Sequence, residues 1–274
     1  MDADARLTPR RLAYVPGALG LGEGPPGVTT RAEFISRIRE QVQKTPGRFS
    51  AASARRPQHP AAEADTIRRE LAERWPETLE AFRREFEGVA GVFHRVATID
   101  MVPAVVSRIA HEREARELVT WHSAALGADL APALGARGLD VHPMPESEPG
   151  GVAERERLRA IAARADLGLT GVDLAIAETG TLVLVSGAGR PRSTSLLPPC
   201  HIAVFDRTVL VESLRQVGVL LEAWHGDGRP PAAGAAINFI TGPSRTADIE
   251  LTLTRGVHGP KEVHAIFVEQ PIRG

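Results

Sequence analysis

The chain has 274 residues, of which 43% are hydrophobic and 24% are charged, and its formal net charge is −1. These values are typical of a soluble globular protein with a large core, and the balanced charge argues against a general affinity for nucleic acid or an anionic membrane. Cys200 is the only cysteine, which excludes an intramolecular disulfide and an iron–sulfur cluster ligated by cysteines of this chain alone.

No stretch of the sequence approaches the ~20 consecutive apolar residues of a membrane span. The first residues also lack an apolar run of signal-peptide length. We therefore expect a cytoplasmic protein without membrane insertion.

The N-terminal part differs in composition from the rest. Residues 1–29 are rich in Gly and Pro, residues 30–43 carry a helical stripe of apolar side chains, and residues 44–64 are rich in Pro, Ala and Ser. We predict an N-terminal arm, helix and loop over residues 1–62 and one α/β domain over residues 63–274. A long helix is predicted over 65–89, with Pro76 expected to kink it or split it.

From residue 90 onward, short apolar runs alternate with helical patterns. Strands are predicted over 91–98, 117–122, 139–144, 201–206, 237–242 and 262–269, with two further β runs inside 172–187. Helices are predicted over 101–114, 127–138, 151–166 and 210–224. This alternation predicts an open, twisted, largely parallel sheet with helices on both faces.

A turn at Glu178-Thr179-Gly180 separates two β runs and predicts a hairpin with Gly180 at its tight point. Glu178 directly follows an apolar strand, where a carboxylate is costly unless it is solvated or paired. In a cleft, Glu178 could act as a base, a nucleophile or a hydroxyl-binding group.

The stretch "SGAGRPRSTS", residues 186–195, combines glycines, hydroxyl groups, Arg190 and Arg192. Such a basic, flexible loop could cover an anionic ligand. Neither GxxxxGK[ST] nor GxGxxG is present, so a P-loop, a nicotinamide site or a flavin site of the usual kind has no sequence support.

A second polar stretch, "GPSRTADIE", follows the apolar run that ends at Thr241. Ligands of open α/β sheets bind outside the carboxyl ends of the strands. Gly242 allows close backbone approach, Ser244 or Thr246 could cap a short helix through Asp248, and Arg245 adds a positive charge, which together predict an anion site. The alternative is a capped turn in which Arg245 pairs with Asp248 or Glu250.

The third polar stretch, "GVHGPKE", places His258 between glycines and before Lys261. Histidine can act as acid, base or ligand near neutral pH, although a lone histidine in a turn is more often a hydrogen-bonded loop residue. No HxxxH, CxxC or HExxH spacing is present, so no metal site is predicted.

We expect three turns, Glu178–Thr181, Gly242–Asp248 and His258–Lys261, to converge on one cleft at the strand ends. The predicted catalytic residues are Glu178 and His258. The predicted anion-binding residues are Thr179, Gly180, Thr181, Arg190, Gly242, Ser244, Arg245, Thr246, Asp248, Gly259 and Lys261.

The stretches "AIAETGTLVLVS", "SLLPPCHIAVF" and "FITGPSRTADIELTLTRGVHGPKEVHAIFVE" together resemble the lactate-utilization protein C family, LutC or YkgG, whose unit is the LUD domain. The resemblance implies a three-layer Rossmann-like fold similar to the NagB/RpiA/CoA-transferase group. It also implies a system that oxidises L-lactate to pyruvate, in which LutA-like and LutB-like partners carry the iron–sulfur clusters and this chain carries no cofactor. In the wider fold group a carboxylate near a strand end serves as nucleophile or base, and Glu178 is its equivalent only by analogy of fold.

Three interpretations follow from the sequence. The first is a non-redox component of a lactate-oxidising assembly, with a pocket for a small carboxylate or phosphate. The second is a stand-alone isomerase or acyl/CoA-transferase-type enzyme that uses Glu178 with Arg245 and His258. The third is a regulatory protein that binds a small acid without turnover.

Overall fold

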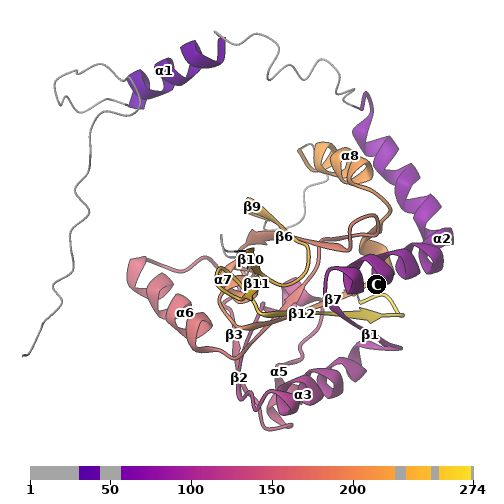
Figure 1. The fold of residues 1–274 in the computed structure, drawn as a ribbon, viewed down its shortest axis with the longest axis vertical. Coiled ribbons are helices and arrows are strands. Elements are labelled where there is room, and N and C mark those ends of the chain that lie inside the picture. Colours follow the sequence, from indigo (N-terminus) through magenta and orange to yellow (C-terminus); the bar gives the residue numbers. More distant parts are fainter. Residues whose placement is uncertain (1–30, 44–56, 226–232, 248–252, 273–274) are drawn as a thin grey trace, which may run out of the picture. The chain divides into compact units, whose positions relative to one another are not determined.

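The computed structural model describes residues 31–43, 57–225, 233–247 and 253–272 (Figure 1). The chain divides into two compact units, residues 1–55 and residues 56–274. The described part of the first unit is helix α1 (Arg31–Gln43), as its apolar stripe predicted. Across the described ranges, no helix is long and apolar enough to cross a membrane.

A six-stranded sheet forms the centre of the second unit, and every neighbouring pair in it is parallel. Its strands lie in the order β1-β12-β7-β4-β2-β3. Their bounds are β1 Val92–Val96, β2 Glu117–Thr120, β3 Asp140–Pro143, β4 Leu167–Gly171, β7 Cys200–Asp206 and β12 Glu262–Val268. This arrangement confirms the predicted parallel α/β architecture, although β4 was not predicted.

A second, mixed sheet was also not predicted. It has four strands in the order β8-β5-β6-β9, with bounds β5 Leu174–Ile176, β6 Thr181–Gly187, β8 Leu210–Val211 and β9 Ala233–Ile240. Strands β5 and β6 form the expected hairpin, with Gly180 at φ +59° in its turn, and β9 pairs antiparallel with β6. The predicted strand over 237–242 therefore lies in this sheet and not in the parallel one.

The helices connect and cover the strands. The long helix α2 spans Pro60–Gly88 and contains Pro76, and it changes direction part-way along its length (Figure 1). The remaining helices are α3 Val102–Glu112, α4 Ser123–Leu126, α5 Ala131–Gly135, α6 Val152–Arg164, α7 Ser193–Leu196 and α8 Leu214–His225, with 3-10 turns η2 Ile99–Met101 and η3 Arg207–Val209.

The core lies in layers on the two faces of the parallel sheet. On one face, α3 and α5 pack against alternate strand residues such as Ile202 and Ile266. On the other face, the intervening residues such as Phe205 and Phe267 pack against α2 and against one side of the mixed sheet. The far side of the mixed sheet packs against α8 and the first half of α2. Alternation along β7 and β12 thus separates two apolar layers, as expected for strands buried on both faces.

Candidate anion-binding site

The hairpin turn between β5 and β6 lies against the last turn of α2. A Cβ at Gly180 would come within 2.3 Å of the Phe86 backbone nitrogen, so only glycine fits there. The hydroxyls of Thr179 and Thr181 lie 2.7 Å apart, and that of Thr181 lies 2.7 Å from the hydroxyl of Thr241. The hairpin turn and the end of β9 are therefore linked by a chain of hydroxyl groups.

The two later polar stretches also meet. The Ser244 amide donates to the Pro260 carbonyl (2.9 Å) and the Gly256 amide donates to the Ser244 carbonyl (3.1 Å). A Cβ on Gly259 would contact the Ser244 side chain at 3.4 Å. The Lys261 amide donates to the carbonyl of Pro199, which directly precedes β7. The meeting point is therefore the amino edge of β7 and β12, not the carboxyl edge that was predicted.

The predicted helix start after Ser244 is wrong for residues 245–247. These residues form strand β10 (Arg245–Ala247), which pairs antiparallel with β11 (Leu253–Arg255). Thr246 lies within β10, and Asp248 lies outside the described residues. The Arg245 guanidinium donates to the Val89 carbonyl, and Gly242, at φ +76°, lies against the same carbonyl. Arg245 thus ties the strand to the end of α2.

Glu178 makes a contact with helix α8 that the sequence did not indicate. Its carboxylate accepts a hydrogen bond from the Leu214 amide (3.0 Å) at the first residue of α8, where a negative charge stabilises a helix. Glu178 lines a hollow of about 290 Å³ beside α2 whose other charged residues are Glu77, Glu85, Glu212, Arg74 and Arg84. Both arginines form ion pairs within the hollow, Arg74 with Glu212 and Arg84 with Glu85, so neither is an unpaired cation for an anionic substrate.

The other predicted catalytic residue, His258, lies in the turn between β11 and β12. The side chains of His258 and Lys261 are both exposed. Within the described parts of the chain, neither side chain has a hydrogen bond or an ion pair. No described contact brings either residue to Glu178.

A separate cavity of about 430 Å³ opens where β3 ends, at the carboxyl edge of the parallel sheet. Its wall on one side is the segment after β3, which includes Met144 and Glu148. The opposite wall is formed by the end of β6 and by the basic loop, the stretch predicted at residues 186–195. Cavities of ~300–1,000 Å³ are usual for small-molecule sites, and this edge is where open α/β sheets bind ligands.

Helix α6 supplies two arginines to this cavity. Leu158 and Ala162 of α6 pack against Val119 and Met144, which fixes the helix on the sheet. Arg155 and Arg159 are one helical turn apart, so they project from the same side of α6 beside Leu158, and both line the cavity. The sequence contained this signal as an i, i+4 arginine pair on the helix after β3, but it was not recognised.

The basic loop is held in place by its own residues. Arg190 is buried and forms an ion pair with Asp173 (3.0 Å), whose second oxygen accepts from the Val185 amide (2.6 Å). Gly189, at φ +73°, allows its carbonyl to accept from the His122 amide (2.8 Å). Arg190, a predicted anion ligand, thus anchors the loop.

Three arginines face the cavity from its rim. Arg155, Arg159 and Arg192 are exposed, and their side chains form no ion pair with any other described residue. The described lining contains one acidic residue, Glu148, together with the hydroxyls of Ser147, Ser186 and Ser193. Guanidinium groups bind carboxylates and phosphates through paired hydrogen bonds, so this lining suits a small anion.

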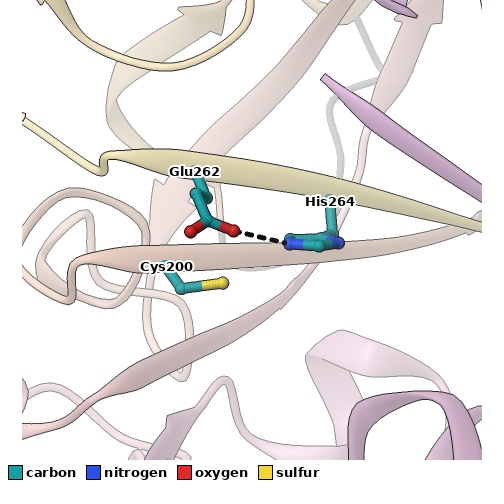
Figure 2. Close-up of side chains that lie close together, drawn as sticks. All are labelled: Cys200, Glu262 and His264. Carbon is teal, nitrogen blue, oxygen red and sulfur yellow. Dashed lines mark hydrogen bonds and ion pairs between the residues drawn. The ribbon is translucent and has the colours of Figure 1, made fainter. Parts of the chain in front are cut away.

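The amino edge carries a contrasting cluster of titratable groups (Figure 2). Arg113, at the end of α3, donates to Glu262 through Nε (2.9 Å) and contacts His264 Nε2 (3.2 Å). His264 Nδ1 lies 3.0 Å from His94 Nε2. Burial, together with Arg113 and His94, lowers the pKa of His264 to about 4, and burial raises the pKa of the Cys200 thiol to about 12. Each described charge in this cluster already has a partner.

Comparisons with known proteins agree on one family. Residues 79–268 match the model of the LUD domain. A "Lactate utilization protein C" from Halalkalibacterium halodurans is 38% identical over 174 residues, which cover 62% of this chain and 70% of that protein. One from Oceanobacillus iheyensis is 30% identical and covers 70% of this chain and 80% of that protein.

Another relative of the same name, from an Exiguobacterium species, is 43% identical over 42% of this chain, but the match spans only half of that protein's length. Among solved structures, a DUF162 family protein from Deinococcus radiodurans is similar with a TM-score of 0.48 and 23% identity, covering 71% of this chain and 98% of that one.

Proposed function

The chain belongs to the LUD domain family, and we propose that it is a non-redox component of an L-lactate utilization system that binds a small carboxylate in the carboxyl-edge cavity. The observation that carries the proposal is the set of three rim arginines, Arg155, Arg159 and Arg192, around one cavity. Lactate and pyruvate are carboxylates, and a guanidinium fork matches the geometry of that group.

The proposal assigns the redox step to partner proteins. Oxidation of lactate to pyruvate removes two electrons and two protons, so an electron acceptor is required. Cys200 is the single cysteine, and it cannot alone hold an iron–sulfur cluster. LutA-like and LutB-like proteins would then carry the electrons, while this chain holds or presents the carboxylate.

The binding step is tested by calorimetric titration of the purified protein with lactate, pyruvate and inorganic phosphate. We expect one site, and we expect binding to weaken roughly tenfold for each of Arg155→Ala, Arg159→Ala and Arg192→Ala. A charge-assisted hydrogen bond contributes about 1.5–3 kcal/mol, and exposed groups fall at the low end of that range. Arg157→Ala is the matched control, because Arg157 is exposed on the same helix but does not line the cavity.

A wild-type protein that binds none of the three anions would contradict the proposal. So would a site that is lost equally in Arg157→Ala. Preference for phosphate over both carboxylates would keep the cavity as an anion site and reassign its ligand.

The assembly step needs a second experiment. Lactate-dependent dye reduction should be measured with purified LutA-like and LutB-like proteins, with and without this chain. We expect no turnover by this chain alone and faster turnover when it is added to both partners. Turnover by the chain alone would favour a stand-alone enzyme instead.

A further inference from the structure

Cys200, Glu262 and His264 bring three different metal-ligand types to one point at the amino edge of the sheet (Figure 2). One ligand atom from each lies within 4.8 Å of the other two. Glu262 and His264 are two residues apart on β12, so they project from the same face, and Cys200 is the register partner of Glu262 on β7. The backbone of two paired strands therefore fixes all three positions.

The ligand set is chemically selective. Thiolate sulfur, imidazole nitrogen and carboxylate oxygen are the three donors that Zn²⁺ uses in proteins, and three protein ligands leave a fourth tetrahedral position open to water. Ca²⁺ and Mg²⁺ bind through oxygen and do not match a site with sulfur and nitrogen.

His264 has the surroundings of a metal-binding histidine. Its Nε2 faces the cluster, 3.2 Å from Arg113 and 3.4 Å from the Glu262 carboxylate, and its Nδ1 lies 3.0 Å from His94 Nε2. Without a metal, Glu262 favours a proton on Nε2. A metal at Nε2 would leave the proton on Nδ1, next to His94, and metal-binding histidines are held in this way by a second group at the outer ring nitrogen.

Arg113 already supplies a positive charge to this cluster, at the place where a metal ion would bind. Its guanidinium bonds to Glu262 and contacts His264, as a bound metal ion would. The Arg113 side chain retains 24% of its exposure and also reaches the Ile109 carbonyl (3.0 Å) and the Glu112 carboxylate (3.4 Å). The Arg113 guanidinium can therefore rotate toward Glu112 and solvent and keep its contacts with the Ile109 carbonyl and the Glu112 carboxylate.

We propose that Cys200, Glu262 and His264 form a Zn²⁺ site for which the Arg113 guanidinium competes. Zinc binding displaces the Cys200 thiol proton to solvent, forms bonds to sulfur, nitrogen and oxygen, and moves Arg113 out to Glu112. No electron is transferred. This site is independent of the carboxyl-edge cavity, so either proposal can fail without the other.

The test is a titration of metal-free, full-length protein with ZnCl₂ by calorimetry, and with Co²⁺ by absorption. We expect one Zn²⁺ per chain and a Co²⁺–thiolate charge-transfer band. Cys200→Ser and His264→Ala should each weaken binding more than ~100-fold, since loss of an outer partner alone costs about 10–100-fold. Arg113→Ala should instead tighten binding about tenfold, because it removes the competing cation and keeps all three ligands.

His142→Ala is the matched control, because His142 also lies near two carboxylates, at 3.5 Å from Asp140 and 4.0 Å from Glu117. It should leave Zn²⁺ affinity unchanged. Absence of Zn²⁺ binding, binding lost in His142→Ala instead, or Arg113→Ala that fails to tighten it would each overturn the proposal. If Cys200→Ser or His264→Ala does not fold, Arg113→Ala and the Co²⁺ band still decide.

Discussion

The two edges of the parallel sheet use charge in opposite ways. At the carboxyl edge, Arg155, Arg159 and Arg192 surround a cavity of about 430 Å³ and have no ion-pair partner among the described residues. At the amino edge, Arg113 and Glu262 lie within hydrogen-bond reach of each other and of His264. Unpaired cations around a cavity are available to an anionic ligand, whereas a paired cation already neutralises a charge of the protein itself.

The same contrast occurs within one loop. Arg190 and Arg192 are two residues apart, but Arg190 is 4% exposed and bonded to Asp173, while Arg192 is exposed at the cavity rim. Residue type alone therefore does not separate an anchor from a ligand-binding group. Burial and the presence of a partner do.

Breaking the ion pair between Arg190 and Asp173 should give the largest loss of stability. Arg190→Ala removes the guanidinium from Asp173, whose side chain is only 11% exposed, which we expect to lower the free energy of unfolding by about 3–5 kcal/mol. Arg192→Ala should change it by less than about 0.5 kcal/mol, as for other surface substitutions. Urea unfolding of both variants measures the difference. Equal loss in the two would mean that the loop has no internal anchor.

Acid should destabilise the sheet through its buried histidines. Burial, with a smaller contribution from His264, lowers the pKa of His201 to about 3, below the unfolded value of 6.5. The unfolded state thus binds more protons, and stability is full above pH 6.5 and falls as the pH drops toward 3. Each such histidine contributes a slope of at most about 1.4 kcal/mol per pH unit.

Unfolding measured between pH 7 and 4 in the wild type and in His201→Gln tests this. The variant should lose less stability per pH unit, even if it is less stable at pH 7, because His201 also bonds to Thr170 (2.9 Å). Parallel curves for the two proteins would show that His201 does not contribute to the pH dependence.

Glu178→Ala should have the smallest effect on stability of the substitutions that break a described contact. The substitution removes the carboxylate that accepts from the first amide of α8, which we expect to cost about 1 kcal/mol. Anion binding at the carboxyl edge should not change. Thermal melts and the lactate titration measure the two quantities, and a variant that loses binding but not stability would show that Glu178 belongs to the anion site.

Periodicity and turn signals were sufficient to predict the α/β class, the long helix now called α2 and the hairpin at Gly180. They missed β4, whose sequence, LGLTG, contains two glycines and reads as a poor strand. A Cβ on Gly168 would come within 1.9 Å of the Thr194 carbonyl oxygen, so packing against α7 requires that glycine. This requirement is tertiary and has no local signature.

The site was harder to predict than the fold, for the same reason. Ser244 and Arg245 read locally as a helix cap with a charge, but pairing of β10 with β11 overrides that preference. The basic loop was recognised, but only the ion pair with Asp173 reveals that Arg190 is its anchor. The amino-edge cluster joins Cys200 to Glu262 and His264 across two strands, so no sequence spacing could indicate it.

The most direct test of the account is hydrogen–deuterium exchange of the full-length protein with and without saturating lactate or pyruvate. We predict slower exchange in the first half of α6, residues 152–159, and in the loop at 186–193, with no change at 241–247 or 256–261. Protection at 241–247 and 256–261 instead, with 152–159 and 186–193 unchanged, would contradict the assignment of the anion site to the carboxyl edge.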